Sequence, residues 1–196
     1  MANNSYRTVY AFAREMYPKN TKTDIQYGTA GFRSRAINLD HVMYRMGLLA
    51  VLRARYKKSV IGVMVTASHN PEPDNGVKLV DPHGEMLEQS WEPWATKFAN
   101  VPDNKLEDTI NELIKEFNIT NMNNRVEIVV GKDTRPSSPH LAKSVMDGVL
   151  ALSGKPVDYG IVTTPQLHYF VVCKNTKRAY GQPTEERILP KIDNRF

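Results

Sequence analysis

The chain has 196 residues, 41% hydrophobic and 24% charged, which is enough for one globular domain with a core and too little for several. Much of its net charge of +5 gathers in Lys174–Phe196, so the body of the chain is near neutral and no specific nucleic acid is expected as a partner. Cys173 is the only cysteine, which excludes an internal disulfide. With no apolar leader and no membrane-length segment, the sequence predicts a cytoplasmic protein without membrane contact.

The first predicted elements are two amphipathic helices on either side of a polar, glycine-containing segment. Apolar residues at helical spacing predict a helix over about residues 5–17, which ends before Pro18. The segment that follows contains Tyr27–Arg33, YGTAGFR, whose two glycines would let backbone amides approach a ligand. A second helix is expected to begin at Asp40, a suitable N-cap residue, and to bury one apolar face.

The next stretch, Val60–Val80, carries the strongest functional signal in the chain. Its β-branched run Val60–Val65 is typical of a strand buried on both faces, and it stops at the polar loop Thr66–Pro71. A second short strand follows a turn. Ser68 is therefore predicted to lie at the mouth of a buried strand, where active-site groups of open α/β sheets collect.

Strands and helices alternate in the remainder of the chain. The expected elements are helices after Ser90 and across Leu106–Phe117, a strand at Val126–Val130, a helix capped by Ser138 that ends at Gly154, a strand at Tyr159–Val162 and a helix through Val172. This alternation predicts an α/β layered domain with a mixed, mostly parallel sheet flanked by helices. Residues 1–176 are expected to form the domain, and residues 177–196 an irregular tail.

Ser68 is the first candidate nucleophile, although a serine hydroxyl needs a base, a metal or a phosphoryl group already bonded to it. His69 is adjacent, but neighbours in an extended loop point in different directions, so adjacency does not establish a catalytic pair. The alternative is that Ser68 and Asn70 only hydrogen-bond the turn. From the residues alone, these two interpretations stay open.

Other polar residues are candidates for phosphate binding or for loop structure. Lys78 and Arg33 are cations at predicted strand and loop ends and suit a phosphate ligand, although either is also consistent with an exposed charge. Asp133 and Arg135 could form a local salt bridge or contact a substrate. The histidines are scattered, and no complete metal or nucleotide motif is visible.

Three motifs together resemble the α-D-phosphohexomutases. TASHNP followed by DNGVKLV is similar to their active-serine loop, YGTAGFR to their early arginine loop, and GKDTRPSS to their G-x-D-x-R segment. The serine loop precedes Gly131–Ser138 here, an order similar to that of the phosphoacetylglucosamine mutase branch. The resemblance covers about residues 20–180.

The resemblance implies a role for each matching residue. Ser68 would be the phosphoserine that exchanges a phosphoryl group with a phosphosugar substrate, and its phosphate would be one ligand of Mg²⁺. Lys78 and Arg33 would serve proton transfer and charge stabilisation, with His69 and Asn70 in the same loop. A hexose 1,6-bisphosphate is the implied activator, and the implied reaction converts N-acetylglucosamine 6-phosphate to the 1-phosphate for UDP-N-acetylglucosamine synthesis.

The chain departs from the family pattern in its extent. It resembles only the first of four domains, and it lacks the D-G-D-x-D-R loop that supplies the remaining Mg²⁺ ligands, the sugar-reading loop and the phosphate clamp. We therefore expect the chain to be a truncated first domain, inactive or nearly so alone. The alternatives are a non-catalytic isoform or fragment, or another phosphohexomutase specificity. The sequence predicts no oligomeric state.

Overall fold

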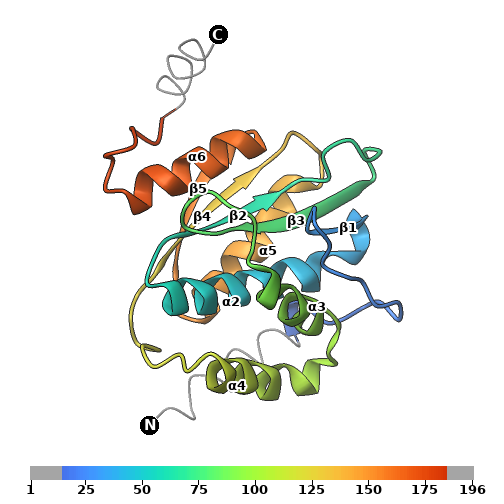
Figure 1. Ribbon diagram of the computed structural model, residues 1–196. Helices are drawn as coiled ribbons and strands as arrows, with labels where there is room; N and C mark the ends of the chain where they lie inside the picture. Colours follow the sequence, from blue (N-terminus) through green and yellow to red (C-terminus); the bar gives the residue numbers. More distant parts are fainter. Residues whose placement is uncertain (1–14, 185–196) are drawn as a thin grey trace.

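The structure, a computed structural model, describes residues 15–184 and contains a five-stranded mixed sheet (Figure 1). The strands lie in the order β1-β3-β2-β4-β5. Their bounds are β1 Phe32–Arg35, β2 Ile61–Val65, β3 Asp74–Val80, β4 Glu127–Lys132 and β5 Lys155–Ile161. Strands β2, β4 and β5 are parallel, whereas β3 is antiparallel to both of its neighbours, β1 and β2. Four strands thus share one direction, which confirms the predicted fold class.

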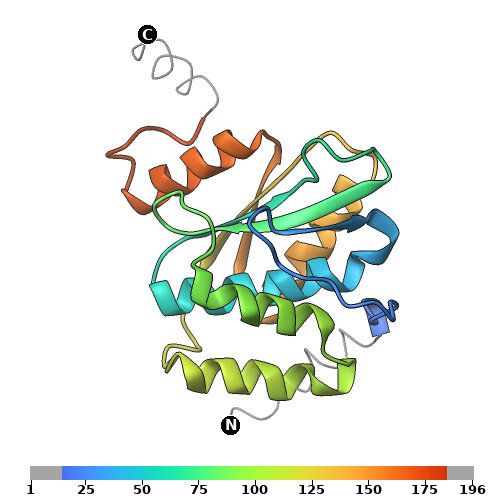
Figure 2. The same ribbon diagram turned by 45° about the vertical axis from the view of Figure 1, so that its right-hand side comes forward.

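Helices cover both faces of this sheet (Figures 1 and 2). Helices α2 (Asp40–Lys57) and α5 (Ser138–Ala151) pack on one face, with α3 (Glu92–Asn100) and α4 (Leu106–Glu116) outside them. Helix α6 (Thr164–Asn175) covers the other face. The larger apolar core lies on the α2 side, and a smaller one lies beneath α6. No helix within residues 15–184 is long and apolar enough to cross a membrane.

Helix α2 reaches its buried position because it crosses α5 at unusually close range. Gly47 and Gly148 face each other at the crossing: a Cβ on Gly148 would lie 2.0 Å from the Tyr44 carbonyl oxygen, and one on Gly47 would lie 2.2 Å from that of Val145. Glycine therefore permits backbone contact between the two helices. This contact seats α2 and α5 together under β2 and β4, the strands that carry the candidate site.

Several predicted boundaries are corrected by the structure. The N-cap of α2 is Leu39, and that of α5 is Ser137, so Asp40 and Ser138 are each the first helical residue instead. Their side chains have other partners, since Asp40 pairs with His140 at 2.7 Å and the Ser138 hydroxyl donates to the Asp133 carboxylate. Strand β5 begins four residues earlier than predicted, at a lysine–proline pair that carries no strand signal.

Two predictions concern the ends of the chain. The helix expected over residues 5–17 lies almost entirely outside the described residues. Residues 177–184, the described part of the expected tail, form turns and bends after α6 ends at Asn175. The domain division at residue 176 stays a prediction.

The buried His41 should make the fold sensitive to acid. Its side chain is only 1% exposed, and burial, assisted by the charges of Arg45 and Lys19, lowers the pKa of His41 to about 4. Between that pH and the ordinary pKa of about 6.5, the unfolded chain binds a proton that the folded chain does not, so stability falls as the pH falls. We expect a loss of about 2–3 kcal/mol between pH 7 and 4.5, measured by urea unfolding.

The matched variants are His41→Gln, which removes this titration, and His83→Gln at an exposed histidine. The His41 variant should show a much shallower decline in unfolding free energy over the same pH range, whereas the His83 variant should follow the parent. An equal decline in all three proteins would show that His41 does not cause the acid sensitivity.

Candidate active site

Ser68 lies in the loop that connects the buried strand β2 to β3. The loop is held by internal hydrogen bonds: the Ser68 amide donates to Thr66 Oγ1 at 3.0 Å, and the Asn70 amide donates to the Ala67 carbonyl at 3.1 Å. Ser68 itself is exposed and has a φ of +54°, in the left-handed region that costs a non-glycine residue about 1–2 kcal/mol. The surrounding contacts therefore hold the candidate nucleophile at the strand mouth in a strained backbone conformation.

Asp133 joins the serine loop to the end of β4. Strands β2 and β4 are parallel neighbours, so their carboxyl ends meet, and the Asp133 amide donates to the Val65 carbonyl at 3.0 Å. The Asp133 carboxylate accepts from Thr66 Oγ1 at 2.8 Å, from Ser138 Oγ, and from the Arg135 amide at 3.1 Å. Burial alone would raise the pKa of Asp133, but the hydrogen bonds from Ser138 and Thr66 outweigh it and hold the pKa below its ordinary value.

Arg135 contacts both Asp133 and the serine loop. Its Nε lies 3.0 Å from Asp133 Oδ2, so the local salt bridge considered from the sequence is present. Its two terminal nitrogens donate to four backbone carbonyls of the loop, at distances of 2.7–3.1 Å. These carbonyls belong to Ser68, Asn70, Pro71 and Asp74. The two motifs GKDTRPSS and TASHNP thus form one structural unit.

The two cations Arg33 and Lys78 lie on β1 and β3, and neither lines the hollow beside Ser68. Arg33 is exposed, and its guanidinium is 3.4 Å from Asn70 Oδ1, a long hydrogen bond. Lys78 is half-buried, and burial lowers its pKa, with the charge of Arg33 lowering it further. A lysine with a depressed pKa is better suited to exchange protons near neutral pH. His69 is exposed next to Ser68 in the same loop.

The glycines of YGTAGFR have a different role from the one predicted. The amides of Gly28 and Gly31 donate to each other's carbonyls, at 3.3 and 2.8 Å, so they close a turn and are not directed at a ligand. Gly31 has a φ of +79°, and a Cβ there would lie 2.3 Å from the Val77 carbonyl oxygen. The turn therefore brings β1 against β3 and places Arg33 next to the serine loop.

A hollow of about 470 Å³ opens beside Ser68, within the range of small-molecule sites. It is lined by Thr66, Ser68, Asn70, Glu72 and residues 133–136. An adjoining hollow of about 410 Å³ shares Thr66, Asp133 and Thr134 and extends to the start of α6. Within residues 15–184, no three His, Cys, Asp or Glu side chains are grouped as metal ligands.

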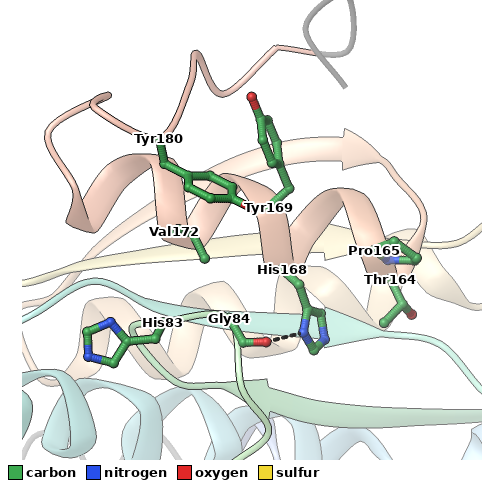
Figure 3. A pocket seen from close by; sticks show the side chains of 8 residues that line it. All are labelled: His83, Gly84, Thr164, Pro165, His168, Tyr169, Val172 and Tyr180. Atoms are coloured by element: carbon green, nitrogen blue, oxygen red, sulfur yellow. Dashed lines mark hydrogen bonds between the residues drawn. The ribbon is translucent and has the colours of Figure 1, made fainter. Parts of the chain in front are cut away.

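A separate hollow of about 480 Å³ lies where the loop after β3 meets α6 (Figure 3). His83 and Gly84 line one side, and Tyr169 and Tyr180 lie along the other. His168 Nδ1 bonds to the Gly84 carbonyl at 2.7 Å, which ties α6 to the loop. Burial lowers the pKa of His168. The residues that line this hollow include none from the serine loop, so it is distinct from the site around Ser68.

Sequence reasoning missed three residues that connect the serine loop to its support. Thr66 bonds both the Ser68 amide and Asp133, and Ser138 bonds Asp133 and the buried Asn75. A signal was available: two apolar strands that each end in a polar loop, within a predicted parallel sheet, place their polar ends side by side. The individual hydrogen bonds carry no such signal, since they depend on side-chain direction in the folded chain.

The fold and this site define the class of protein. Residues 31–100 and 104–180 match the family model described as phosphoglucomutase/phosphomannomutase, alpha/beta/alpha domain I. The chain belongs to this family and contains its α/β/α domain I.

Within this family, the chain is similar to enzymes named phosphoacetylglucosamine mutases. The chain is 56% identical over 172 residues to human phosphoacetylglucosamine mutase, an alignment that covers 88% of this chain and 32% of the relative. It is 45% identical to an Aspergillus fumigatus N-acetylphosphoglucosamine mutase solved with GlcNAc-6P and magnesium, with a TM-score of 0.86 and coverage of 96% of this chain and 35% of that one.

A second Aspergillus fumigatus structure, of a serine-to-alanine variant in complex with glucose 1,6-bisphosphate, gives a TM-score of 0.91 at 45% identity. It covers 97% of this chain and 36% of that one. The resemblance to phosphoacetylglucosamine mutases is thereby confirmed. The chain spans about a third of the length of the curated relatives that it matches.

Proposed function

We propose that this chain is the phosphoserine-bearing domain of a mutase that converts N-acetylglucosamine 6-phosphate to N-acetylglucosamine 1-phosphate. The observation that carries the proposal is the serine loop: Ser68 is exposed at a strand mouth, in a strained conformation, beside a hollow of small-molecule size. The relatives support N-acetylglucosamine as the sugar, because one is named phosphoacetylglucosamine mutase and another was solved in complex with GlcNAc-6P. We include a cytoplasmic location and UDP-N-acetylglucosamine synthesis in the proposal.

In the proposed reaction, Ser68 carries a phosphoryl group on Oγ. The free 1-hydroxyl of the 6-phosphosugar attacks that phosphorus, the bond to Ser68 Oγ breaks, and a sugar 1,6-bisphosphate forms. Ser68 Oγ then attacks the phosphorus at position 6, which releases the 1-phosphate and restores the phosphoserine. Each transfer moves one proton between a sugar hydroxyl and the protein, and no net phosphate is consumed. A hexose 1,6-bisphosphate would phosphorylate Ser68 by the second half of this cycle.

The neighbouring residues take roles that follow from their environments. Lys78, whose pKa is lowered by burial, exchanges the proton with the sugar hydroxyl. Arg33 is exposed at the same end of the sheet and stabilises charge on the transferring phosphoryl group. His69 and Asn70 shape the loop next to it. Asp133 and Arg135 support the loop from β4.

We propose one ligand of a magnesium ion in this domain and leave the others unassigned. A phosphate on Ser68 would supply one oxygen ligand, and magnesium in such a site would neutralise charge on the transferring group. The residues that the structure describes do not complete the site: the Asp133 carboxylate already accepts hydrogen bonds from Thr66, Ser138 and Arg135, and residues 15–184 contain no group of three His, Cys, Asp or Glu side chains that could hold a metal ion. The remaining magnesium ligands would have to come from outside residues 15–184.

The proposed function is tested in a full-length chimera. A chimera is made in which this chain replaces the matching segment of human phosphoacetylglucosamine mutase, and conversion of N-acetylglucosamine 6-phosphate is assayed with Mg²⁺ and glucose 1,6-bisphosphate. We expect turnover by the chimera and little or none by the 196-residue chain alone. A folded chimera that binds the sugar phosphate but shows no turnover would favour the non-catalytic alternative. Turnover only with glucose or mannose phosphates would favour another specificity.

A further inference from the structure

The guanidinium of Arg135 uses all of its hydrogen-bonding capacity inside the protein. An arginine side chain has five N–H donors in a planar arrangement. In this structure Nε donates to Asp133, one terminal nitrogen donates to the carbonyls of Pro71 and Asp74, and the other donates to those of Ser68 and Asn70. Five donors thus meet five acceptors, and none remains for a ligand without breaking a bond to the loop.

The positions of these acceptors show what the five bonds accomplish. Four of the five are backbone carbonyls spread across the serine loop, from Ser68 at one end to Asp74 at the start of β3. The side chain of Arg135 is only 11% exposed, and all five bonds are assisted by its charge. The bond to the Ser68 carbonyl fixes the peptide plane that follows a residue at positive φ. Arg135 therefore adds five bonds to the internal hydrogen bonds that hold Ser68 in its exposed conformation.

Arg33 provides the contrast within the same site. Its guanidinium is exposed and makes one long contact, of 3.4 Å, with Asn70. A phosphate can approach Arg33 at little cost, whereas an approach to Arg135 would compete with five existing bonds. Of the two arginines, only Arg33 is suited to contact the substrate.

We propose that Arg135 is a positioning residue for phosphoryl transfer: it clamps the serine loop from the segment that follows the neighbouring strand β4 and does not bind the substrate phosphate. Asp133 completes the clamp, because its carboxylate fixes the Arg135 side chain and also bonds Thr66, at the start of the loop. The catalytic part of this inference rests on the proposed function. The structural part, that loop conformation depends on Arg135, stands independently.

The structural part is tested by hydrogen exchange on the 196-residue chain. In Arg135→Ala, the amides of Ser68, Asn70 and Asp74, which bond within the loop, should exchange at least about tenfold faster, because bonds to a charged donor are among the strongest in proteins. Amides within β2 and α5 should keep their protection. Added guanidinium at millimolar concentration should restore part of the loop protection. Unchanged exchange in the loop would overturn the clamp.

Two further variants keep this test decisive. Arg135→Lys retains the charge but has three donors and no fork, so it should restore protection only in part. Arg125→Ala, which removes an exposed arginine, should leave loop exchange at the parent value. If Arg135→Ala unfolds, the lysine variant decides alone: full protection in it would show that charge suffices and would overturn the clamp, whereas partial loss would support it.

The catalytic part is tested in the chimera. Because Arg135 does not touch the substrate, Arg135→Lys should lower kcat by about 10²-fold and leave KM within about threefold, the effect of a misplaced reacting group. A rise in KM at unchanged kcat would show phosphate binding and overturn the inference. An inactive parent chimera would instead reject the proposed function, while the exchange result would still decide the structural clamp.

Discussion

Replacement of Ser68 by alanine in the chimera should lower kcat by at least about 10³-fold, because the variant has no oxygen to carry the phosphoryl group between the two sugar positions. The substitution removes one exposed hydroxyl, so folding should not change. Turnover is measured by formation of N-acetylglucosamine 1-phosphate, and folding by thermal denaturation.

Ser90→Ala is the matched control for this substitution. Ser90 is also exposed, but it lies away from the serine loop and bonds Glu88. The control should retain the activity of the parent chimera. Activity in Ser68→Ala above about a tenth of the parent would exclude Ser68 as the phosphoryl carrier.

Replacement of Asp81 by alanine should destabilise the fold by about 3–5 kcal/mol, the largest effect expected on stability. The side chains of Arg53 and Asp81 are 0% and 2% exposed, and they form a fork-to-fork pair in which Arg53 Nε lies 2.9 Å from Asp81 Oδ1. Trp91 covers the guanidinium at 4.7 Å. Without Asp81, a buried charge keeps only its bond to Glu88, which is half exposed.

Urea unfolding of the 196-residue chain measures this effect, with Asp108→Ala as the control. Asp108 pairs with Lys105 at the surface, where both side chains are more than 60% exposed, so its removal should change the unfolding free energy by less than about 1 kcal/mol. Equal and small effects of the two substitutions would show that the buried pair does not stabilise the fold.

The layered fold could be predicted because its signals are local. Apolar runs such as Val60–Val65 and helical spacing in Leu106–Phe117 each report on burial of their own segment, and their alternation predicts the α/β class. Strand order is not a local property. The position of β3 between β1 and β2, antiparallel to both, depends on which edges pair in the folded chain.

The predicted helix N-caps were wrong for a related reason. Asp40 and Ser138 have the right side chains to cap a helix, but distant partners compete for them: His140 for Asp40, and Asp133 for Ser138. Capping preferences describe a helix end in isolation, and tertiary contacts override them.

The motifs named the residues proposed for the site, but the contacts that build the site could not be predicted. Motifs named Ser68, Arg33, Lys78 and Arg135, yet the sequence left Arg135 open between a salt bridge and a substrate contact. The decisive contacts join Arg135 to carbonyls 61–67 residues away in sequence, and they exist only because β2 and β4 are neighbours. Backbone acceptors carry no sequence signal, so only the folded chain shows that the arginine is fully occupied.

Phosphate mapping shows directly whether Ser68 carries the phosphoryl group. The chimera is incubated with glucose 1,6-bisphosphate and Mg²⁺, digested, and analysed by mass spectrometry, with the Ser68→Ala variant in parallel. We expect one phosphate on the peptide that contains Ser68, and none on the corresponding peptide of the variant. Phosphate on a different residue, or equal labelling of the variant, would show that Ser68 is not the phosphoryl carrier.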